Sequence, residues 1–301
     1  MHRGPHILCL FLAAIAAAGE PPITLSQLSR KTADGPVEVF VAQVNLADPL
    51  IEVVVTEPLP GTLAADGDGT TTHEAVLTPT DQWAKDNKLE LAVNANFFGR
   101  LGKDPEADII GLSISDGRVI SPLRSFEKNA DPALVFAKDN TARIACIDEA
   151  QLPGAWDAVA GVGASEKTPR LGGLLVQDGK NLGEKARVEP MVRHPRTGAG
   201  VSADGRTLWL VVVDGRQAGY SVGMTLPELA DLLIELGADD AVALDGGGSS
   251  AFVAKKNESE WITNKPSDGK FRPVANSLGF RLREPEKQDS SPAASSDAVV
   301  K

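Results

Sequence analysis

The pattern of apolar and polar positions is clearest between Arg193 and Val253. An apolar run from Leu208 to Val213 follows the turn sequence Ser202-Ala203-Asp204-Gly205, which predicts a hairpin with one buried strand. A second apolar run, Ala241 to Leu244, is too short for a helix and predicts another buried strand. This strand ends directly before Asp245, and the carboxyl end of a strand is a frequent place for a ligand site.

Between these two strands the spacing predicts one helix. Thr225-Leu226-Pro227-Glu228 has the form of a capping box, in which the threonine hydroxyl accepts from the helix start and the glutamate reaches back to the cap. Gly237 fits the left-handed position just past the helix end. The apolar positions between these limits recur at helical spacing, at Leu226, Leu229, Leu233 and Leu236.

Elsewhere the chain consists of short apolar runs separated by turn residues. We expect further strands, hairpins and one helix: strands over 37–46, 51–56, 89–93, 171–177 and 277–282, hairpins over 111–120 and 134–146, and a helix over 79–87. These elements predict an α+β fold, with a strand-rich mixed sheet and a few helices. No Pro/Ser-rich or charged linker divides the interior of the chain, so we expect a single large domain.

The two ends of the chain differ from its interior. Residues 1–18 combine a short basic start, an apolar run and Ala16-Ala17-Ala18, which predicts a cleaved signal peptide too short to span a bilayer. We expect a lead-in over 19–34, the domain over 35–283 and a polar, disordered tail over 284–301. The mature chain keeps only Cys146, so no internal disulfide is expected. These features predict a secreted or periplasmic protein without stable membrane insertion.

The charge of the chain limits its partners. A formal net charge of −11 argues against a nucleic-acid partner and against a generally basic surface. Arginines nevertheless gather in one segment, at Arg193, Arg196 and Arg216. In an acidic protein this clustering indicates a local anion site. The sequence does not indicate an oligomeric state.

Three glycines follow Asp245 and precede Ser249 and Ser250. A glycine run lets backbone N–H groups approach an anion, because no side chain blocks the way. The alternative interpretation is a flexible turn between two strands. The acid before the run, the hydroxyls after it and the nearby arginines favour a functional site.

Three further candidates each have two interpretations. Asn96, in Asn94-Ala95-Asn96-Phe97-Phe98, offers an amide that suits sugar hydroxyls, but it also suits a turn cap. Asp214 is either a second catalytic carboxylate or a turn residue before Gly215. His194 is either an acid or, as is more usual for a histidine beside a proline, a structural hydrogen-bonding residue.

Several motifs in order give the chain a family resemblance. Asn94-Ala95-Asn96-Phe97-Phe98 is followed by Arg193-His194-Pro195-Arg196-Thr197, Asp214-Gly215-Arg216-Gln217, Gly223-Met224-Thr225-Leu226, Asp245-Gly246-Gly247-Gly248-Ser249-Ser250 and Arg272-Pro273-Val274-Ala275-Asn276. Together they resemble the phosphodiester glycosidase family over roughly residues 35 to 283. The chain departs from the family at Ala95 and Asn96, where two glycines are frequent.

The resemblance implies hydrolysis of the anomeric C–O bond of a sugar-1-phosphodiester. The implied substrate resembles a GlcNAc-1-phosphodiester, either a small molecule or part of an exopolysaccharide or cell-wall glycan. Asp245 would act as general base or nucleophile, with Asp214 as the second carboxylate. The remaining roles are phosphate binding by Arg196 and Arg216, uncharged donation by Gly246, Gly247, Gly248 and Ser249, and sugar binding by Asn96.

Two other functions remain open from the sequence. The first is a non-catalytic carbohydrate- or phosphoglycan-binding domain, which has no need for Asp245 beside the glycine run. The second is a metal-dependent phosphodiesterase. The chain has four histidines, two of them in the expected signal peptide, and no His/Asp cluster at ligand spacing, so no metal and no cofactor are predicted.

Overall fold

The computed structural model describes residues 21–59, 74–100, 105–123, 132–146, 152–161 and 172–284. The expected signal peptide over 1–18 lies outside these ranges, as does the expected tail after Glu284. The expected domain over 35–283 is described except for the gaps between the ranges.

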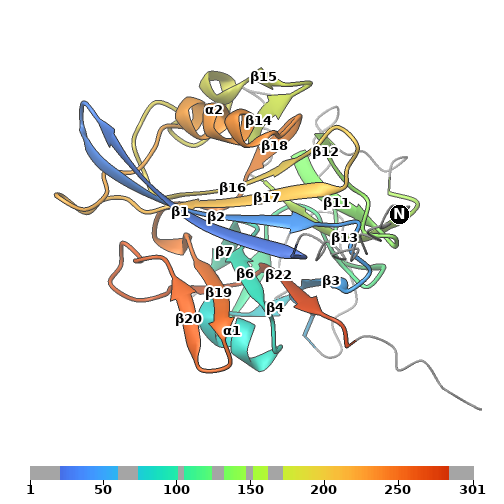
Figure 1. The fold of residues 1–301 in the computed structure, drawn as a ribbon. Helices are drawn as coiled ribbons and strands as arrows, with labels where there is room; N and C mark the ends of the chain where they lie inside the picture. Colours follow the sequence, from blue (N-terminus) through green and yellow to red (C-terminus); the bar gives the residue numbers. More distant parts are fainter. Residues whose placement is uncertain are drawn as a thin grey trace, which may run out of the picture.

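The largest sheet of the described residues has seven strands (Figure 1). Its order is β1 (Ile23–Thr32), β2 (Gly35–Asn45), β17 (Thr207–Val213), β16 (Arg196–Val201), β18 (Asp240–Ala243), β14 (Leu174–Gln177) and β15 (Lys180–Asn181). Each neighbouring pair is antiparallel. Residues 19–34, the expected lead-in, contain β1, which pairs with β2 over its whole length.

Two five-stranded sheets complete most of the fold within the described ranges. One has the order β20 (Glu260–Thr263), β19 (Phe252–Asn257), β6 (Leu91–Asn94), β22 (Ser277–Leu282) and β3 (Ile51–Val55). The other has the order β10 (Arg118–Ser121), β9 (Ser113–Ser115), β13 (Ala155–Ala160), β11 (Pro132–Ala137) and β12 (Ala142–Cys146). Shorter strands form two small sheets. In one, β21 (Pro273–Val274) pairs with β5 (Thr78–Pro79); the other has the order β4 (Ala75–Val76), β8 (Glu106–Ile109) and β7 (Phe98–Arg100).

The longer helix, α2 (Leu226–Leu236), begins and ends as its sequence predicts. The Thr225 hydroxyl accepts from the Glu228 N–H at 3.3 Å, and the Glu228 carboxylate accepts from the Thr225 N–H at 2.9 Å. Gly237 ends the helix with a φ of 111°. The second α-helix is α1 (Thr80–Asp86), and two short 3₁₀ turns are η2 (Gly183–Lys185) and η3 (Gly247–Ser249).

Both faces of the seven-stranded sheet are covered (Figure 1). Helix α2 packs its buried leucines on one face, against residues that include Val211 and Val213. The opposite face, including Leu210 and Val212, packs against the two five-stranded sheets. This double burial explains why the run from 208 to 213 is apolar throughout rather than alternating.

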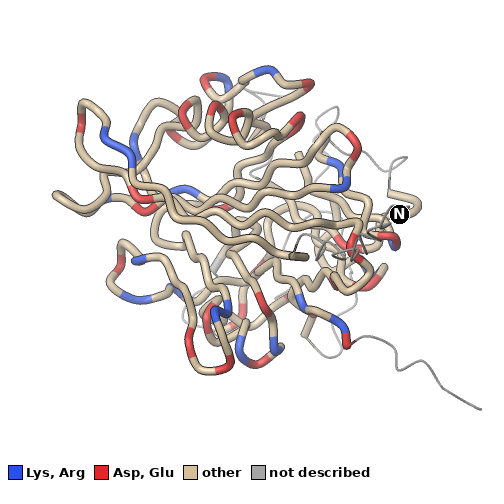
Figure 2. The backbone as a smooth tube through the Cα atoms, viewed as in Figure 1, with Lys and Arg blue, Asp and Glu red and all other residues tan. Residues whose placement is uncertain are grey.

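Charged residues lie mainly in the loops and in α2, while the central strands contain few of them (Figure 2). The expected hairpins at 111–120 and 134–146 are present as β9–β10 and β11–β12. The α+β, strand-rich fold class is confirmed. Within the described ranges, neither helix has the length and apolar character needed to cross a membrane.

Candidate active site

Three neighbouring strand ends of the seven-stranded sheet meet at the candidate site. β17 and β18 both run antiparallel to β16, which lies between them, so both end at the edge where β16 begins. The register pairs Arg196 at the start of β16 with Val213 at the end of β17. Because Asp214 follows β17 and Asp245 follows β18, the topology brings both segments to the same edge as Arg196.

Asp245 lies where the chain crosses from β18 to β19 of the second sheet. Its N–H donates to the Ala95 carbonyl at 2.9 Å, and its carbonyl accepts from Asn94 Nδ2 at 2.5 Å. Asn94 Oδ1 also accepts from Thr197 Oγ1 at 2.7 Å and from the Ala251 N–H at 3.0 Å. The Asn94 side chain therefore holds the backbone on both sides of the glycine run.

The Asp245 carboxylate is held by the turn that it begins. Oδ1 accepts from the Gly246 N–H at 2.9 Å, and the Ser249 hydroxyl also hydrogen-bonds to the carboxylate. Burial raises the pKa of Asp245 to about 6, although the bonds from Ser249 and Gly246 and the charge of Arg272 lower it. Asp245 is therefore mostly ionised at neutral pH and becomes protonated in mildly acidic conditions.

The glycine run leaves room for two arginines at the backbone. Gly247 has a φ of 60°, and a Cβ there would lie 3.2 Å from Arg216 Nη1. A Cβ at Gly248 would collide with Arg272 and Asp268. The left-handed φ favours glycine at Gly247, and the lack of a side chain at Gly248 lets the Arg272 guanidinium approach the backbone closely.

The N–H groups of the glycine run have different partners. The Gly246 N–H donates to Asp245, and the Gly247 N–H donates to the Pro195 carbonyl at 2.9 Å. The Gly248 N–H has no acceptor among the described residues. One of the three predicted backbone donors is therefore available to a ligand, and the other two stabilise the turn.

Arg196 is buried and organises the loop that precedes it. Its Nε donates to the Met224 carbonyl at 3.2 Å, and its Nη1 donates to the Val188 carbonyl at 3.1 Å. Its Nη2 donates to the carbonyls of Glu189 and Val192 at 2.9 and 2.8 Å. A guanidinium has five N–H groups, so these bonds leave one for a ligand. Burial lowers the pKa of Arg196 to about 10, so the group stays cationic at neutral pH.

Arg216, His194 and Glu189 form a chain of polar contacts. Arg216 Nε and Nη2 approach His194 Nδ1 at 3.3 and 3.2 Å. His194 Nε2 lies 2.6 Å from Glu189 Oε2. Arginine only donates, so Nδ1 accepts and Nε2 carries the hydrogen donated to Glu189. Arg216 is exposed, and its Nη1 has no hydrogen-bond partner among the described residues.

These side chains line one pocket of about 170 Å³. Within the described part of the chain, its charged lining consists of four arginines and two carboxylates, and His194 also lines it. Arg272 is oriented by Asp268, which accepts from Nε and Nη2 at 3.1 and 2.8 Å. The lining residues that bear on the chemistry are Phe97, Arg187, Val188, Glu189, His194, Arg196, Arg216, Asp245, Gly246, Gly247, Gly248 and Arg272.

Asp214 does not line this pocket. It is 1% exposed, and its carboxylate accepts from the Tyr220 hydroxyl, Asn264 Nδ2 and the Lys265 N–H, each at 2.9 Å. Asn264 also donates to the Ser250 carbonyl at 3.2 Å. The Asp214 side chain thus connects the end of β17 to the segment after the glycine run, and burial raises its pKa.

Asn96 also lies outside the pocket lining. Its Nδ2 donates to the carbonyls of Ile110 and Leu112 at 3.1 and 3.0 Å. Its Oδ1 accepts from the Ala160 N–H at 3.2 Å and from Asn276 Nδ2 at 2.9 Å. The amide is buried and directed to the protein, so the structure does not bring it to the ligand space.

Ser249 is placed behind the pocket rather than on its surface. Its hydroxyl hydrogen-bonds to Asp245 and accepts from Arg272 Nη1 at 3.3 Å. Of the residues predicted for the site, the structure brings together Asp245, the glycines, Arg196 and Arg216. It adds pocket residues that the sequence analysis did not assign to the site: Phe97, Arg187, Glu189 and Arg272. Arg272 lies in one of the resemblance motifs, which is the signal that could have identified it.

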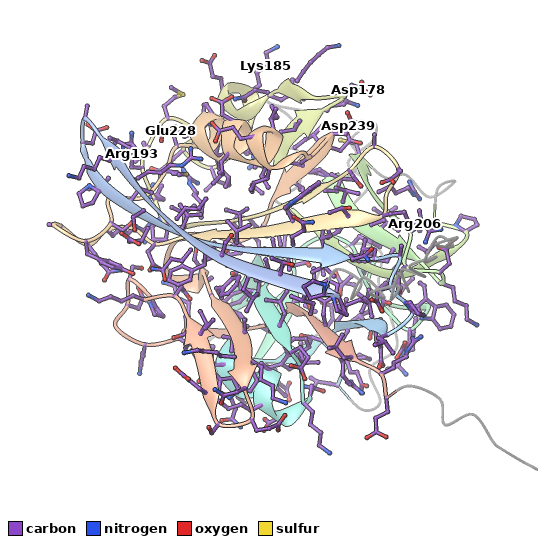
Figure 3. All side chains as sticks on the ribbon, viewed as in Figure 1. Asp178, Lys185, Arg193, Arg206, Glu228 and Asp239 are labelled. Carbon is purple, nitrogen blue, oxygen red and sulfur yellow. The ribbon has the colours of Figure 1, made fainter. Side chains whose placement is uncertain are left out.

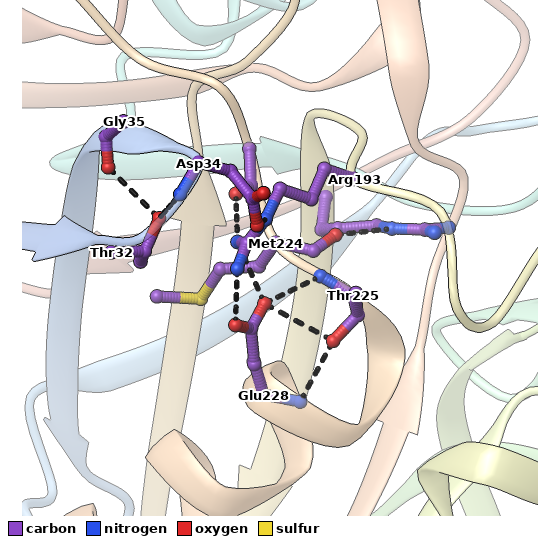
Figure 4. A network of polar contacts seen from close by, with 9 residues as sticks. Thr32, Asp34, Gly35, Arg193, Met224, Thr225 and Glu228 are labelled. Atoms are coloured by element: carbon purple, nitrogen blue, oxygen red, sulfur yellow. Dashed lines mark hydrogen bonds and ion pairs between the residues drawn. The ribbon is translucent and has the colours of Figure 1, made fainter.

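Arg193 supports the site from outside the pocket (Figures 3 and 4). It pairs with Asp34 at the tip of the β1–β2 hairpin at 2.7 Å, and with Glu228 at the start of α2 at 2.6 Å. The next residue, His194, exchanges both backbone hydrogen bonds with Met224, at 3.2 and 3.1 Å. The Arg193 network therefore fixes the backbone that carries His194.

Among the described residues, no three His, Cys, Asp or Glu side chains lie together in a way that could hold a metal ion.

The chain is similar to several known proteins. It is 31% identical over 212 residues to the SPbeta prophage-derived uncharacterized protein YomE of Bacillus subtilis strain 168. That match covers 70% of this chain but 30% of YomE, so the chain spans less than a third of the length of this relative.

Two solved structures share the fold. One is the zebrafish N-acetylglucosamine-1-phosphodiester alpha-N-acetylglucosaminidase catalytic domain, auto-inhibited by its pro-peptide, with a TM-score of 0.61, 20% identity and coverage of 89% of this chain and 85% of that one. The other is a putative exported protein from Burkholderia pseudomallei, with a TM-score of 0.53, 18% identity and coverage of 82% and 74%. At these identities the likeness shows the fold alone.

Residues 87–281 match the family model for phosphodiester glycosidases. This range covers more than half of the chain and contains Asp245, the glycine run and all four arginines of the pocket. The protein therefore belongs to the phosphodiester glycosidase family, whose members are hydrolases.

Proposed function

We propose that this protein hydrolyses the anomeric C–O bond of a sugar-1-phosphodiester that resembles a GlcNAc-1-phosphodiester. The observation that carries the proposal is the joint placement of Asp245 and the arginines in one pocket. A carboxylate stabilises the positive charge that develops at the anomeric carbon. Guanidinium groups bind the phosphate that leaves with the electron pair of the broken bond.

Arg216 is the main phosphate ligand in this proposal. It lies at the exposed side of the pocket, and its Nη1 donors have no protein partner among the described residues. Arg196 contributes its charge and its one remaining N–H from the buried side. The Gly248 N–H adds an uncharged donor. The phosphate leaves as an anion, so it requires charge stabilisation more than protonation by a strong general acid.

Asp245 acts on the sugar, as general base on water or as nucleophile at the anomeric carbon. Both roles require the ionised carboxylate, which a pKa of about 6 provides at neutral pH. Ser249 positions this carboxylate and keeps its pKa from rising further. Glu189 is the second carboxylate that reaches the pocket, and its contact with His194 links it to Arg216.

Asp214 and Asn96 act as positioning residues in this account. Asp214 holds Asn264 and the segment after the glycine run. Asn96 holds the turn at 110–112 against β13, directly before Phe97, which lines the pocket. The sugar is then bound by pocket residues other than Asn96.

The biological setting remains part of the proposal. A cleaved signal peptide over 1–18 would deliver the protein to the periplasm or the exterior, and the putative exported protein of similar fold supports this location. Exopolysaccharides and cell-wall glycans that contain sugar-1-phosphodiesters are accessible there. We therefore propose that the substrate is a sugar-1-phosphate diester that is either part of such a glycan or a small molecule.

The bond that breaks can be identified with isotope-labelled water. The protein is incubated with GlcNAc-1-phosphate methyl ester in H₂¹⁸O, and both products are analysed by mass spectrometry. Cleavage at the anomeric carbon places the label in the free sugar. Label in the phosphate would show P–O cleavage and overturn the proposal. Absence of turnover across GlcNAc, glucose and galactose esters would also overturn it.

A further inference from the structure

Exposed apolar side chains gather in one loop beside the pocket. Among the described residues, the large hydrophobic side chains that are exposed include Val188 at 42%, Met191 at 62% and Val192 at 47%. The others are Val76 and Leu282, which belong to different strands. Single exposed apolar residues are ordinary, but a group next to a ligand pocket indicates binding. We call residues 187–192 the rim loop.

The rim loop is held rigidly, so its apolar side chains are not exposed through lack of order. Three of the four Arg196 bonds go to its carbonyls. The Leu226 N–H at the start of α2 donates to the Pro190 carbonyl at 2.8 Å, and the Val192 N–H donates to the Glu189 carbonyl at 3.0 Å. These contacts fix the backbone while leaving Met191 and Val192 in solvent.

The backbone of the rim loop is also strained. Val188 has a φ of 67° and Glu189 a φ of 50°. A left-handed conformation is unusual for a β-branched residue, and strained residues tend to cluster where ligands are held. The bonds from Arg196 to the carbonyls of Val188 and Glu189 keep the loop in this conformation.

The rim loop adjoins the proposed phosphate position. Val188 and Glu189 line the pocket. Glu189 contacts His194, and His194 contacts Arg216 at the exposed side of the pocket. With the sugar at Asp245 and the phosphate at Arg216, the alcohol on the far side of the phosphate leaves the pocket next to the rim loop.

We infer that the rim loop is the leaving-group subsite and that it selects phosphodiesters whose second ester is an apolar alcohol, such as an alkyl or isoprenoid chain. This inference rests on the proposed function, because it assigns the part of the substrate beyond the phosphate. Val188 contacts the first carbons of the chain, and Met191 and Val192 contact the carbons that follow. The polar part of the pocket retains the sugar and the phosphate.

The test uses a series of GlcNAc-1-phosphate esters with methyl, butyl and octyl alcohols, below the micelle concentration of the octyl ester. We expect kcat/KM to rise about two- to fourfold for each methylene that becomes buried on the rim loop. In Met191→Ser and Val192→Ser, the ratio of kcat/KM for the octyl ester to that for the methyl ester should fall by about tenfold, from the loss of the same apolar contact.

Val76→Ser is the matched control. Val76 is a valine with 43% exposure, close to the 47% of Val192, but it lies on β4 outside the pocket lining. Its octyl-to-methyl ratio should equal that of the unmodified protein. Thermal melts of all variants show whether a change in the ratio follows from unfolding.

The outcomes separate the inference from the proposed function. Equal kcat/KM for the methyl and octyl esters would contradict the inference and leave the proposed function intact. A chain-length preference that persists in both rim-loop variants would also contradict the inference. If no ester in the series is hydrolysed, both fail together. A preference lost in the rim-loop variants and kept in Val76→Ser supports it.

Discussion

Replacing Ser249 by alanine removes one hydrogen bond to the Asp245 carboxylate and leaves the bond from the Gly246 N–H in place. A hydrogen bond to a charged group contributes about 1.5–3 kcal/mol. Since about 1.36 kcal/mol corresponds to one pKa unit, the pKa of Asp245 should rise by about one to two units. From about 6 in the native protein, it would reach about 7–8 in the variant.

The sign of the effect on activity follows from the role of Asp245. Turnover requires the ionised carboxylate, so kcat/KM falls as the pH decreases through the pKa of Asp245. In the native protein this acidic limb should lie near the pKa of about 6. In Ser249→Ala it should move to higher pH. The assay is kcat/KM for GlcNAc-1-phosphate methyl ester between about pH 5 and pH 9, where the phosphodiester keeps its charge.

Ser250→Ala is the matched control for this experiment. Ser250 is the next residue and is 2% exposed, but its buried hydroxyl has no hydrogen-bond partner among the described residues. Its removal should leave the acidic limb in place. An unshifted limb in Ser249→Ala would refute the reasoning, as would equal shifts in both variants.

Three further predictions concern stability, packing and phosphate binding. Burial raises the pKa of Asp157 to about 7 from 3.8, so its ionisation destabilises the fold increasingly as the pH rises from about 4 to about 7. Asp157→Asn should therefore raise the free energy of unfolding by up to about 4 kcal/mol at pH 8 and by little at pH 4, measured by urea denaturation; an equal effect at both pH values would contradict this. Gly248→Ala should lower kcat/KM about tenfold or more, because the new Cβ displaces Arg272 and Asp268; activity equal to that of the native protein would show that the pair can move freely. Arg216→Met should lower kcat/KM for the phosphodiester by about 10²–10³-fold through loss of its charged donors; a smaller loss than in an Arg206→Met control would remove Arg216 from phosphate binding.

The predictable parts of the fold are those with strong local signals. The helix from Leu226 to Leu236 carries its own cap, its own apolar face and a terminal glycine, and the structure contains all three features. The run from Leu208 to Val213 is buried on both faces, which makes it continuous and easy to recognise. β1 was not predicted, because it is an edge strand whose residues are only partly buried and show no continuous apolar run.

The candidate site was predictable where the chemistry is local. Asp245 and the glycines lie within a few residues of one another, so their proximity follows from the sequence. The direction in which a side chain points does not follow from the sequence in the same way. Asn96 turns to carbonyls at 110–112, and Asp214 turns to Asn264, and both partners come from distant segments.

Arg196 shows a related difficulty. Its position at the start of β16 is consistent with phosphate binding, but most of its donors go to the rim loop. Glu189 lies far before the glycine run in the sequence and Arg272 lies after it, yet both line the pocket. Apart from the resemblance motif that contains Arg272, nothing local to either residue indicates that the fold brings it to Asp245.

The central claim is that Asp245 performs the chemistry on the sugar. Turnover of GlcNAc-1-phosphate methyl ester by Asp245→Asn tests it most directly. Asp239→Asn is the control, because Asp239 lies directly before the first residue of β18, at the opposite end of that strand from Asp245, and outside the pocket lining (Figure 3). We predict that kcat falls about 10²–10⁴-fold in Asp245→Asn, with the fold retained, and is unchanged in Asp239→Asn. Release of free sugar by Asp245→Asn at the native rate would contradict the account.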